Sequence, residues 1–244
     1  MRDYKTEFEN RVNFVKRLLE RTGAKGIVYG NSGGKDCTLV GIICKSACEN
    51  TLGVIMPCFS KRNYEEDRID ALKVAQKYDI ETKIVDLTEV KRAELKSLEK
   101  VVSLTDSASS NINPRLRMTT LYAIGAAENR LVAGTGNKSE IYMGYFTKWG
   151  DGGCDFNPIS DLTATEVFEF LRYLDAPKEI IEKAPSAGLF EGQTDEKDMG
   201  ITYADIDNFL ETGYATEENK QILARYHDSS EHKRTMPVFY ENSL

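Results

Sequence analysis

The chain has 244 residues, of which 41% are hydrophobic, and this is enough for one α/β domain with a full core. Its 39 acidic residues outnumber its 32 basic ones, and the net charge of −7 argues against a general nucleic-acid-binding surface. No apolar run approaches the ~20 residues of a membrane span, and the first helix is amphipathic rather than a secretory signal. We therefore expect a soluble, cytoplasmic protein that binds neither nucleic acid nor a membrane.

Periodic apolar residues predict strands and helices in alternation. The first predicted helix has an apolar side made of Phe8, Val12, Val15 and Leu19. Branched and aromatic runs then predict strands at 26–29, 52–57, 82–86 and 131–134. At least one helix lies between each pair, including helices at 65–77, 90–100 and 115–128. The fold class is therefore α/β, a Rossmann-like parallel β-sheet flanked by helices.

Two further expectations concern side chains and loops. In the helix at 65–77, we expect Ile69, Leu72 and Ala75 to face the core. Ser, Asn and Asp are abundant at 103–114, and glycine and proline are scattered through 183–199. Both stretches predict long loops, a class that is usually functional or mobile inside a compact domain.

The stretch Ser32-Gly33-Gly34-Lys35-Asp36 lies between the first predicted strand and a helix. Glycines allow the backbone to approach a ligand closely, and the amides at a helix start favour an anion. Asp36 adds a carboxylate of the kind that holds magnesium beside a triphosphate. The spacing matches neither the P-loop nor the dinucleotide fingerprint. A glycine-rich turn that only connects a strand and a helix is the alternative interpretation.

A second strand is followed by glycines, at Gly134-Thr135-Gly136. Here Thr135 is a candidate nucleotide contact, and Glu140 is a candidate second carboxylate for magnesium, although a turn with a solvated acid is the alternative. Because ligands of parallel sheets bind beyond the carboxyl ends of the strands, we expect the segments 31–36, 57–62 and 135–140 to meet.

Two more segments carry residues that core packing does not explain. The stretch 144–155 combines aromatic residues, a lysine, two aspartates and four glycines within twelve residues. Near the start of a predicted helix, Arg115 and Arg117 suit bidentate bonds to a carboxylate or a phosphate. A surface ion pair is the ordinary alternative for such arginines.

Together these segments resemble the ammonia-dependent NAD synthetases of the N-type ATP pyrophosphatase superfamily. The resemblance runs in order over nearly the whole chain, and the block at 144–153 is more specific than the shared pyrophosphate loop. It implies an adenine nucleotide alpha-hydrolase-like fold. The matching blocks are those at 31–36, 113–118, 134–140, 144–153, 157–159, 184–187, 193–196, 203–207 and 231–234.

The resemblance implies a reaction in which deamido-NAD, ATP and ammonia give NAD, AMP and pyrophosphate. It implies a homodimer, and it assigns magnesium to Asp36 and Glu140. The implied ATP-binding residues are Gly30, Asn31, Ser32, Gly33, Gly34, Lys35, Asp36, Cys37, Thr135 and Ser186. The implied deamido-NAD-binding residues are Arg115, Lys148, Asp155, His232 and Lys233, although 231–234 also suits a solvated tail. Asp151 or Asp155 is a candidate base for the attacking nitrogen, with Asp151 preferred.

Two positions depart from the family pattern. Cys37 replaces a serine and is a weaker hydrogen-bond donor. Ala164 stands where the family has a lysine that helps to bind ATP, so Lys35, Lys61 or another cation has to substitute or ATP binds more weakly. The rival functions are a tRNA-modifying or GMP-forming ATP pyrophosphatase and a nucleotide-binding protein without catalysis. We expect one domain over residues 1–244, with no glutaminase domain.

Overall fold

The structure is a computed structural model that describes residues 2–59, 66–182 and 195–240. Within these ranges, four strands form one sheet in the order β3-β2-β1-β4, and each neighbouring pair is parallel. Val28 on β1 lies opposite Leu52 on β2 and Val132 on β4. The predicted parallel α/β sheet is thus confirmed. The strands are β1 (Gly26–Gly30), β2 (Thr51–Ile55), β3 (Glu81–Ile84) and β4 (Arg130–Ala133).

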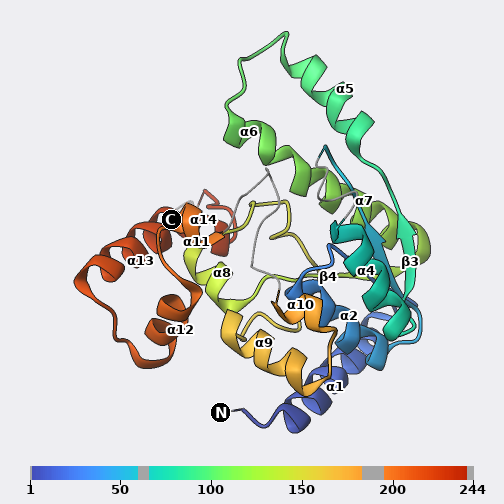
Figure 1. Ribbon diagram of the computed structural model, residues 1–244. Helices are drawn as coiled ribbons and strands as arrows, with labels where there is room; N and C mark the ends of the chain where they lie inside the picture. Colours follow the sequence, from blue (N-terminus) through green and yellow to red (C-terminus); the bar gives the residue numbers. More distant parts are fainter. Residues whose placement is uncertain (1, 60–65, 183–194, 241–244) are drawn as a thin grey trace.

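Helices cover both faces of this sheet and extend the molecule to one side (Figure 1). Within the described residues they are α1 (Tyr4–Thr22), α2 (Lys35–Ala47), α4 (Glu66–Lys77), α5 (Thr88–Leu98), α6 (Asp106–Ser110), α7 (Ile112–Glu128), α8 (Lys138–Met143), α9 (Ala164–Tyr173), α10 (Lys178–Glu182), α11 (Asp195–Met199), α12 (Tyr203–Thr212), α13 (Glu217–Ser229) and α14 (Glu231–Arg234). Across these described helices, none has the length and apolarity that crossing a membrane requires.

The two faces of the sheet belong to two separate apolar clusters. Ile27 and Tyr29 on β1 pack with α1, α2 and α9. Val28, which lies between them in the sequence, points to the other face and packs with residues of α7 such as Leu121. Side chains alternate between the faces of a strand, so one short run of branched residues supplies both layers. A third cluster, centred on Met143, Ile206 and Leu223, joins α8, α12 and α13 beside the sheet.

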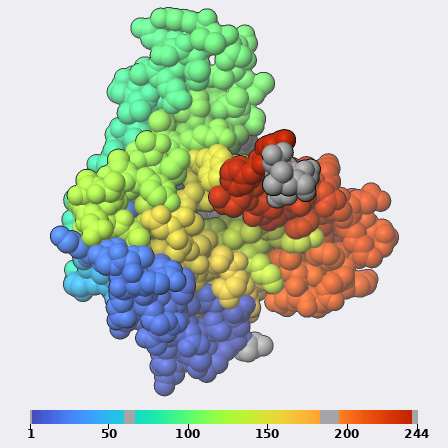
Figure 2. Space-filling view, turned by 180° about the vertical axis from the view of Figure 1, so that it is seen from behind, coloured from blue at the N-terminus to red at the C-terminus, as the bar shows by residue number. Residues whose placement is uncertain are grey.

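The long loop predicted at 103–114 is wrong. Residues 106–110 form α6, and α7 begins at Ile112. Thr105 caps α6 by accepting a hydrogen bond from the Ala108 N–H at 3.2 Å. Serine and asparagine are common at helix starts as well as in loops, so composition alone did not distinguish the two. Figure 2 shows the region around α5 and α6 projecting from the body of the molecule. Of the second predicted loop, residues 195–199 form α11, and 183–194 lie outside the described residues.

The predicted inward face of α4 is also partly wrong. Ala75 is buried, but Ile69 is 54% exposed and Leu72 is 39% exposed. The helix packs on the glycine loop through Ala71, whose carbonyl accepts a hydrogen bond from Asn31 Nδ2 at 3.2 Å. A Cβ on Gly33 would lie 2.4 Å from the Asp67 carbonyl oxygen, and Gly33 has φ +71°. The backbone of α4 therefore lies directly against the loop, which requires glycine at position 33, and Ile69 and Leu72 lie away from this contact.

Two buried polar side-chain atoms of the described residues have no hydrogen-bond partner, Arg11 Nε and the Tyr29 hydroxyl, and the second lies in the apolar core. The Tyr29 ring lies over Gly41, and its hydroxyl is buried without a hydrogen-bond partner among the described residues. An unsatisfied buried hydroxyl costs free energy. Tyr78 provides a matched contrast, because its hydroxyl donates to the Leu174 carbonyl at 3.2 Å.

We predict that Tyr29→Phe raises the free energy of unfolding by about 1 kcal/mol, because it removes the unpaired hydroxyl. Tyr78→Phe is expected to lower it by about 1 kcal/mol, because it removes a hydrogen bond and leaves a carbonyl unpaired. Urea unfolding followed by circular dichroism measures both. Equal destabilisation by the two variants would show that the Tyr29 hydroxyl is satisfied.

Candidate active site

The carboxyl ends of three strands open into one large cleft of about 1440 Å³. Its lining includes 30–32 and 34–37 at the end of β1 and just after it, Val54–Pro57 at the end of β2, and Ala133–Gly136 at the end of β4. The expected meeting of these segments is confirmed for the described residues; 60–62 lie outside them. The opposite walls come from α6, α7, α8 and the segment 144–154, which places both of the unusual sequence blocks in the same cleft.

The first glycine loop forms a turn that presents the start of α2 to the cleft. The Asn31 side chain holds the turn, because its Oδ1 accepts from the Gly33 N–H at 3.3 Å. Cys37 Sγ donates to the Gly34 carbonyl at 3.2 Å, so the thiol stabilises the first turn of α2. Ser32 is exposed at the cleft. Of the predicted ATP-binding residues of this loop, all but Gly33 line the cleft.

A pair of carboxylates, Asp36 and Glu140, lies at the junction of α2 and α8. Asp36 Oδ1 accepts from Asn137 Nδ2 at 3.1 Å. Asn137 is also the N-cap of α8 and forms a capping box with Glu140, whose Oε2 accepts from the Asn137 N–H at 3.1 Å. Asp36 and Glu140 lie 104 positions apart in the sequence. The fold brings these two predicted metal ligands to one site, and both line the cleft.

The electrostatics of this pair favour an additional cation. Burial and the charge of Asp36 raise the pKa of Glu140 to about 8, while Lys35 opposes the shift. Lys35 Nζ donates to Asp36 Oδ2 at 2.5 Å. Burial opposes its charge, but the charges of Asp36 and Glu140 raise the pKa of Lys35 overall. Two acids share one ammonium here.

The two carboxylates suit magnesium, which takes only some of its ligands from the protein, better than a metal ion coordinated by protein side chains alone. Within the described residues, no group of three or more histidines, cysteines, aspartates or glutamates has the geometry to hold a metal ion. Magnesium is commonly bound by one or two carboxylates and completes its shell with water and phosphate oxygens. Asp36 and Glu140 supply that number of hard oxygen donors beside the phosphate loop.

The 144–153 block forms a second wall around Asp151. Its Oδ1 accepts from the Thr147 N–H at 2.9 Å, so the carboxylate is fixed in direction. The enclosing cleft raises the pKa of Asp151 through burial, although the side chain remains open to solvent. Lys233 Nζ lies at the same wall and donates to the carbonyls of Gly144 and Phe146, both at 2.7 Å. Thr135, the other predicted nucleotide contact, also lines the cleft.

The remaining predicted substrate residues do not line the cleft. Lys148 donates to the His232 carbonyl, and Arg115 Nη2 donates to the Lys148 carbonyl at 3.4 Å. These three residues form a chain of contacts that runs from the start of α7 to α14. Asp155 lies elsewhere, where it accepts from the Tyr122 hydroxyl at 3.1 Å and the Val132 N–H at 2.8 Å. Ser186 lies outside the described residues.

The two departures from the family pattern have different consequences. The Cys37 thiol still donates to the Gly34 carbonyl at the start of α2. Ala164 is 1% exposed, packs in the cluster around Met143, and is not part of the cleft lining. Its N–H donates to Ser139 Oγ at 3.1 Å. Position 164 therefore presents no cation to the cleft, and Lys61 lies outside the described residues.

Three positioning features were missed by the sequence prediction. The bridging role of Asn137 had a signal, because Asn-x-x-Glu is a capping-box pattern. Asp195 lines the cleft and accepts a hydrogen bond from the Tyr203 hydroxyl at 3.1 Å, and no local sequence pattern predicts this contact. The segment 157–161 supports the second glycine loop, because Asn157 Nδ2 donates to the Gly136 carbonyl at 2.8 Å.

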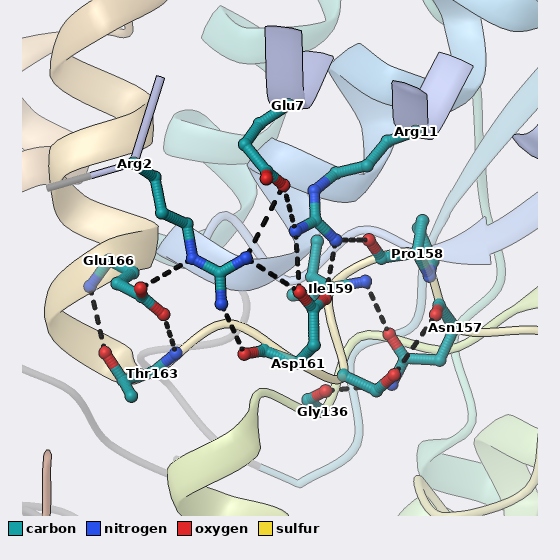
Figure 3. A network of polar contacts seen from close by, with 11 residues as sticks. Arg2, Glu7, Arg11, Gly136, Asn157, Pro158, Ile159, Asp161, Thr163 and Glu166 are labelled. Atoms are coloured by element: carbon teal, nitrogen blue, oxygen red, sulfur yellow. Dashed lines mark hydrogen bonds and ion pairs between the residues drawn. The ribbon is translucent and has the colours of Figure 1, made fainter. Parts of the chain in front are cut away.

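Helix α1 binds the segment 157–161 through the side chain of Arg11 (Figure 3). Arg11 Nη1 donates to the Pro158 carbonyl and to Asp161 Oδ1, both at 2.6 Å. Its Nη2 donates to Asp161 Oδ2 at 2.9 Å and to Glu7 at 2.7 Å. Arg2 adds a contact to Glu166 at 2.6 Å. The amphipathic N-terminal helix thus carries a polar clamp as well as an apolar face.

Comparison with known proteins identifies the family. A family model described as NAD synthase matches residues 7–237. The NH3-dependent NAD+ synthetase of Carboxydothermus hydrogenoformans is 46% identical over 238 residues, 96% of this chain and 97% of that protein. The solved NMN synthetase from Francisella tularensis has a TM-score of 0.93 at 35% identity and covers 98% of this chain and 99% of that one. The NH3-dependent NAD synthetase from Campylobacter jejuni has a TM-score of 0.80 at 28% identity, over 99% and 100%. This chain belongs to the NAD synthase family.

Proposed function

We propose that the protein amidates deamido-NAD with ammonia at the expense of ATP, giving NAD, AMP and pyrophosphate. The observation that carries this proposal is full-length membership of the NAD synthase family, together with a glycine loop and two carboxylates at the carboxyl edge of the sheet. Membership of that family disfavours the tRNA-modifying and GMP-forming alternatives. A binding protein without catalysis is disfavoured because Asp36 and Glu140 are both present at one site.

The proposed reaction has two steps. In the first, the nicotinate carboxylate attacks the α-phosphorus of ATP, and pyrophosphate leaves. In the second, ammonia attacks the acyl carbon of the adenylate, and AMP leaves. Phosphoryl and nucleotidyl transfer need positioning and charge neutralisation more than a protein nucleophile. The cleft suits this requirement, because its loops offer backbone amides and its acids offer metal ligands.

We assign the phosphates of ATP to the loop at Gly30–Cys37, where the N-terminus of α2 favours an anion. Asp36 and Glu140 would hold magnesium there, and Asn137 would keep both carboxylates in place. Magnesium, when bound, neutralises phosphate charge and helps pyrophosphate to leave. Thr135 and Ser186 are proposed as further ATP contacts.

Asp151 is the proposed acceptor of a proton from the attacking nitrogen. Its fixed direction and raised pKa suit a group that takes a proton and later releases it. We assign deamido-NAD to the rim formed by Arg115, Lys148 and His232, beside Lys233. Asp155 is retained as a proposed substrate residue, and substrate binding there would add to or replace its contact with Tyr122.

The decisive experiment mixes purified protein with deamido-NAD, ATP, magnesium and either ammonium or glutamine. We expect stoichiometric NAD, AMP and pyrophosphate with ammonium, and no NAD with glutamine that is free of ammonia. Chromatography of the nucleotides and a coupled pyrophosphate assay measure the products. Equal rates from ammonia-free glutamine would overturn the nitrogen assignment.

A second candidate substrate is nicotinate mononucleotide. The observation that favours it is the TM-score of 0.93 to the Francisella tularensis NMN synthetase, against 0.80 to the Campylobacter jejuni NAD synthetase. The same assay with nicotinate mononucleotide in place of deamido-NAD separates the two candidates. We expect kcat/KM to favour deamido-NAD by about tenfold or more, because the rim residues suit a second nucleotide half. A preference for the mononucleotide would assign the protein to NMN formation.

For the metal carboxylates, we predict that Asp36→Asn and Glu140→Gln each lower turnover by about a hundredfold or more, because each removes a charge that stabilises the transition state. Glu166→Gln is a matched control, since Glu166 forms the same capping box with Thr163 at the start of α9, away from the cleft. This control should change thermal stability but leave turnover within about twofold. Near-normal adenylation in either cleft variant would remove the metal assignment.

We also propose a single catalytic domain over residues 1–244, without a glutaminase domain, that works as a cytoplasmic homodimer. The near-complete match to the Carboxydothermus hydrogenoformans protein supports the domain assignment. The solvent-facing side of α7 carries the exposed small residues Thr119, Ala123 and Ala127, which permit close approach of a second helix. Sedimentation at micromolar concentration should give twice the chain mass, and a fully active monomer would contradict the dimer.

A further inference from the structure

Lys35 occupies an unusual place for a lysine. It is the first residue of α2, and its side chain is 6% exposed. The ammonium donates to Asp36 Oδ2 at 2.5 Å. It also lies 5.6 Å from the ring centroids of both Phe168 and Tyr203. Lysine is seldom buried unless it is paired, so this position reflects a specific interaction with the acids around it.

The charges of three carboxylates act on this ammonium, and one of them is in direct contact with it. Asp36 binds it directly, and the charges of Glu140 and Asp195 act on it from nearby. Asp36 cannot turn away freely, because its other oxygen is held by Asn137 Nδ2 at 3.1 Å. The lysine therefore contacts one oxygen of a carboxylate whose second oxygen is already engaged.

The other basic residues among the described lining of the cleft are directed differently. Lys233 donates to the carbonyls of Gly144 and Phe146. Arg117 Nε donates to the Met56 carbonyl at 3.2 Å, and Arg234 donates to carbonyls that include that of Tyr142 at 3.3 Å. These contacts tie parts of the wall together. Lys35 instead pairs with Asp36, one of the two acids that we assign to magnesium, and the charge of the other, Glu140, acts on it from nearby.

We propose that Lys35 is a counter-ion that keeps unbound magnesium from binding to Asp36 in the nucleotide-free enzyme. The metal then enters the site together with ATP. The inference rests on the proposed role of Asp36 and Glu140 in the reaction. A divalent ion that arrives alone must displace the ammonium from Asp36 Oδ2 and meets its repulsion at close range. ATP changes the balance, because its phosphates supply both metal ligands and a new anionic partner for Lys35.

This role also accounts for the position of the cation in this chain. Ala164 is buried away from the cleft and presents no charge to it. Lys35 reaches Asp36 from the start of α2, next to the phosphate loop. Once released from Asp36, its ammonium would remain within a side-chain length of the bound phosphates. One lysine thus protects the acids before ATP binds and supplies positive charge afterwards.

The test measures metal binding to the nucleotide-free protein, with Mn²⁺ as the probe and electron paramagnetic resonance of free Mn²⁺ as the readout. We expect Lys35→Met to bind Mn²⁺ at least about tenfold more tightly than the wild type, because a nearby positive charge is removed. Lys35→Arg keeps the charge and should stay within about threefold of the wild type. Lys45→Met, on the same helix but paired with the exposed Glu49, should have no effect.

A second measurement tests the proposal in case the Lys35→Met variant is less stable than the wild type. If loss of the ammonium beside Asp36 weakens the fold of Lys35→Met, magnesium without ATP should raise its melting temperature more than that of the wild type. An Mn²⁺ affinity within about twofold of the wild type, or a melting temperature that does not respond to magnesium, would overturn the proposal. Both assays omit ATP and deamido-NAD, so failure of the proposed reaction in the activity assay is read separately.

Discussion

The hydrogen bond from Asn137 Nδ2 to Asp36 Oδ1 joins the two halves of the site, and the rest of the cleft depends on it. Asn137 is fully buried, caps α8, and forms the capping box with Glu140. Asp36 belongs to the first turn of α2, after β1, whereas Glu140 follows β4. One amide therefore fixes the relative position of two loops that come from neighbouring parallel strands. Neighbouring strands with aligned carboxyl ends make such a short bridge possible.

The support for this junction comes from the opposite end of the chain. Arg11 on α1 binds the segment 157–161 through Pro158 and Asp161, and Asn157 in turn binds the Gly136 carbonyl (Figure 3). The Arg11 side chain is only 10% exposed, so its ion pairs are less weakened by solvent than those on the surface. Arg11 contacts no predicted ligand residue. It supports the second glycine loop indirectly, because it binds the segment 157–161 and this segment binds Gly136.

The sequence was sufficient to predict those parts of the molecule that depend on local patterns. The parallel sheet follows from strands and helices in alternation, and the meeting of Asp36 and Glu140 follows from parallel strand ends. Failures occurred where tertiary contacts decide. Ile69 and Leu72 fit an inward face by periodicity, but α4 packs on the glycine loop through its backbone near Ala71, and both of those side chains are exposed. Likewise, no spacing in the sequence reveals that Lys35 points into the acidic pair.

The basic residues of the cleft carry the same charge but have different roles. Lys233 and Arg234 belong to α14. Lys233 binds the carbonyls of Gly144 and Phe146, just after α8, and Arg234 binds that of Tyr142 near the end of α8, so the solvated-tail interpretation is wrong for both. Gly144, with φ +63°, lets Ser230 approach so closely that a Cβ would lie 2.1 Å from the Ser230 side chain. The same block that we assigned to deamido-NAD therefore closes the wall of the cleft. His232 differs, because its side chain is exposed while its carbonyl accepts from Lys148. Lys233 thus holds the wall of the cleft together, whereas Lys148 and His232 lie outside the cleft lining and contact each other.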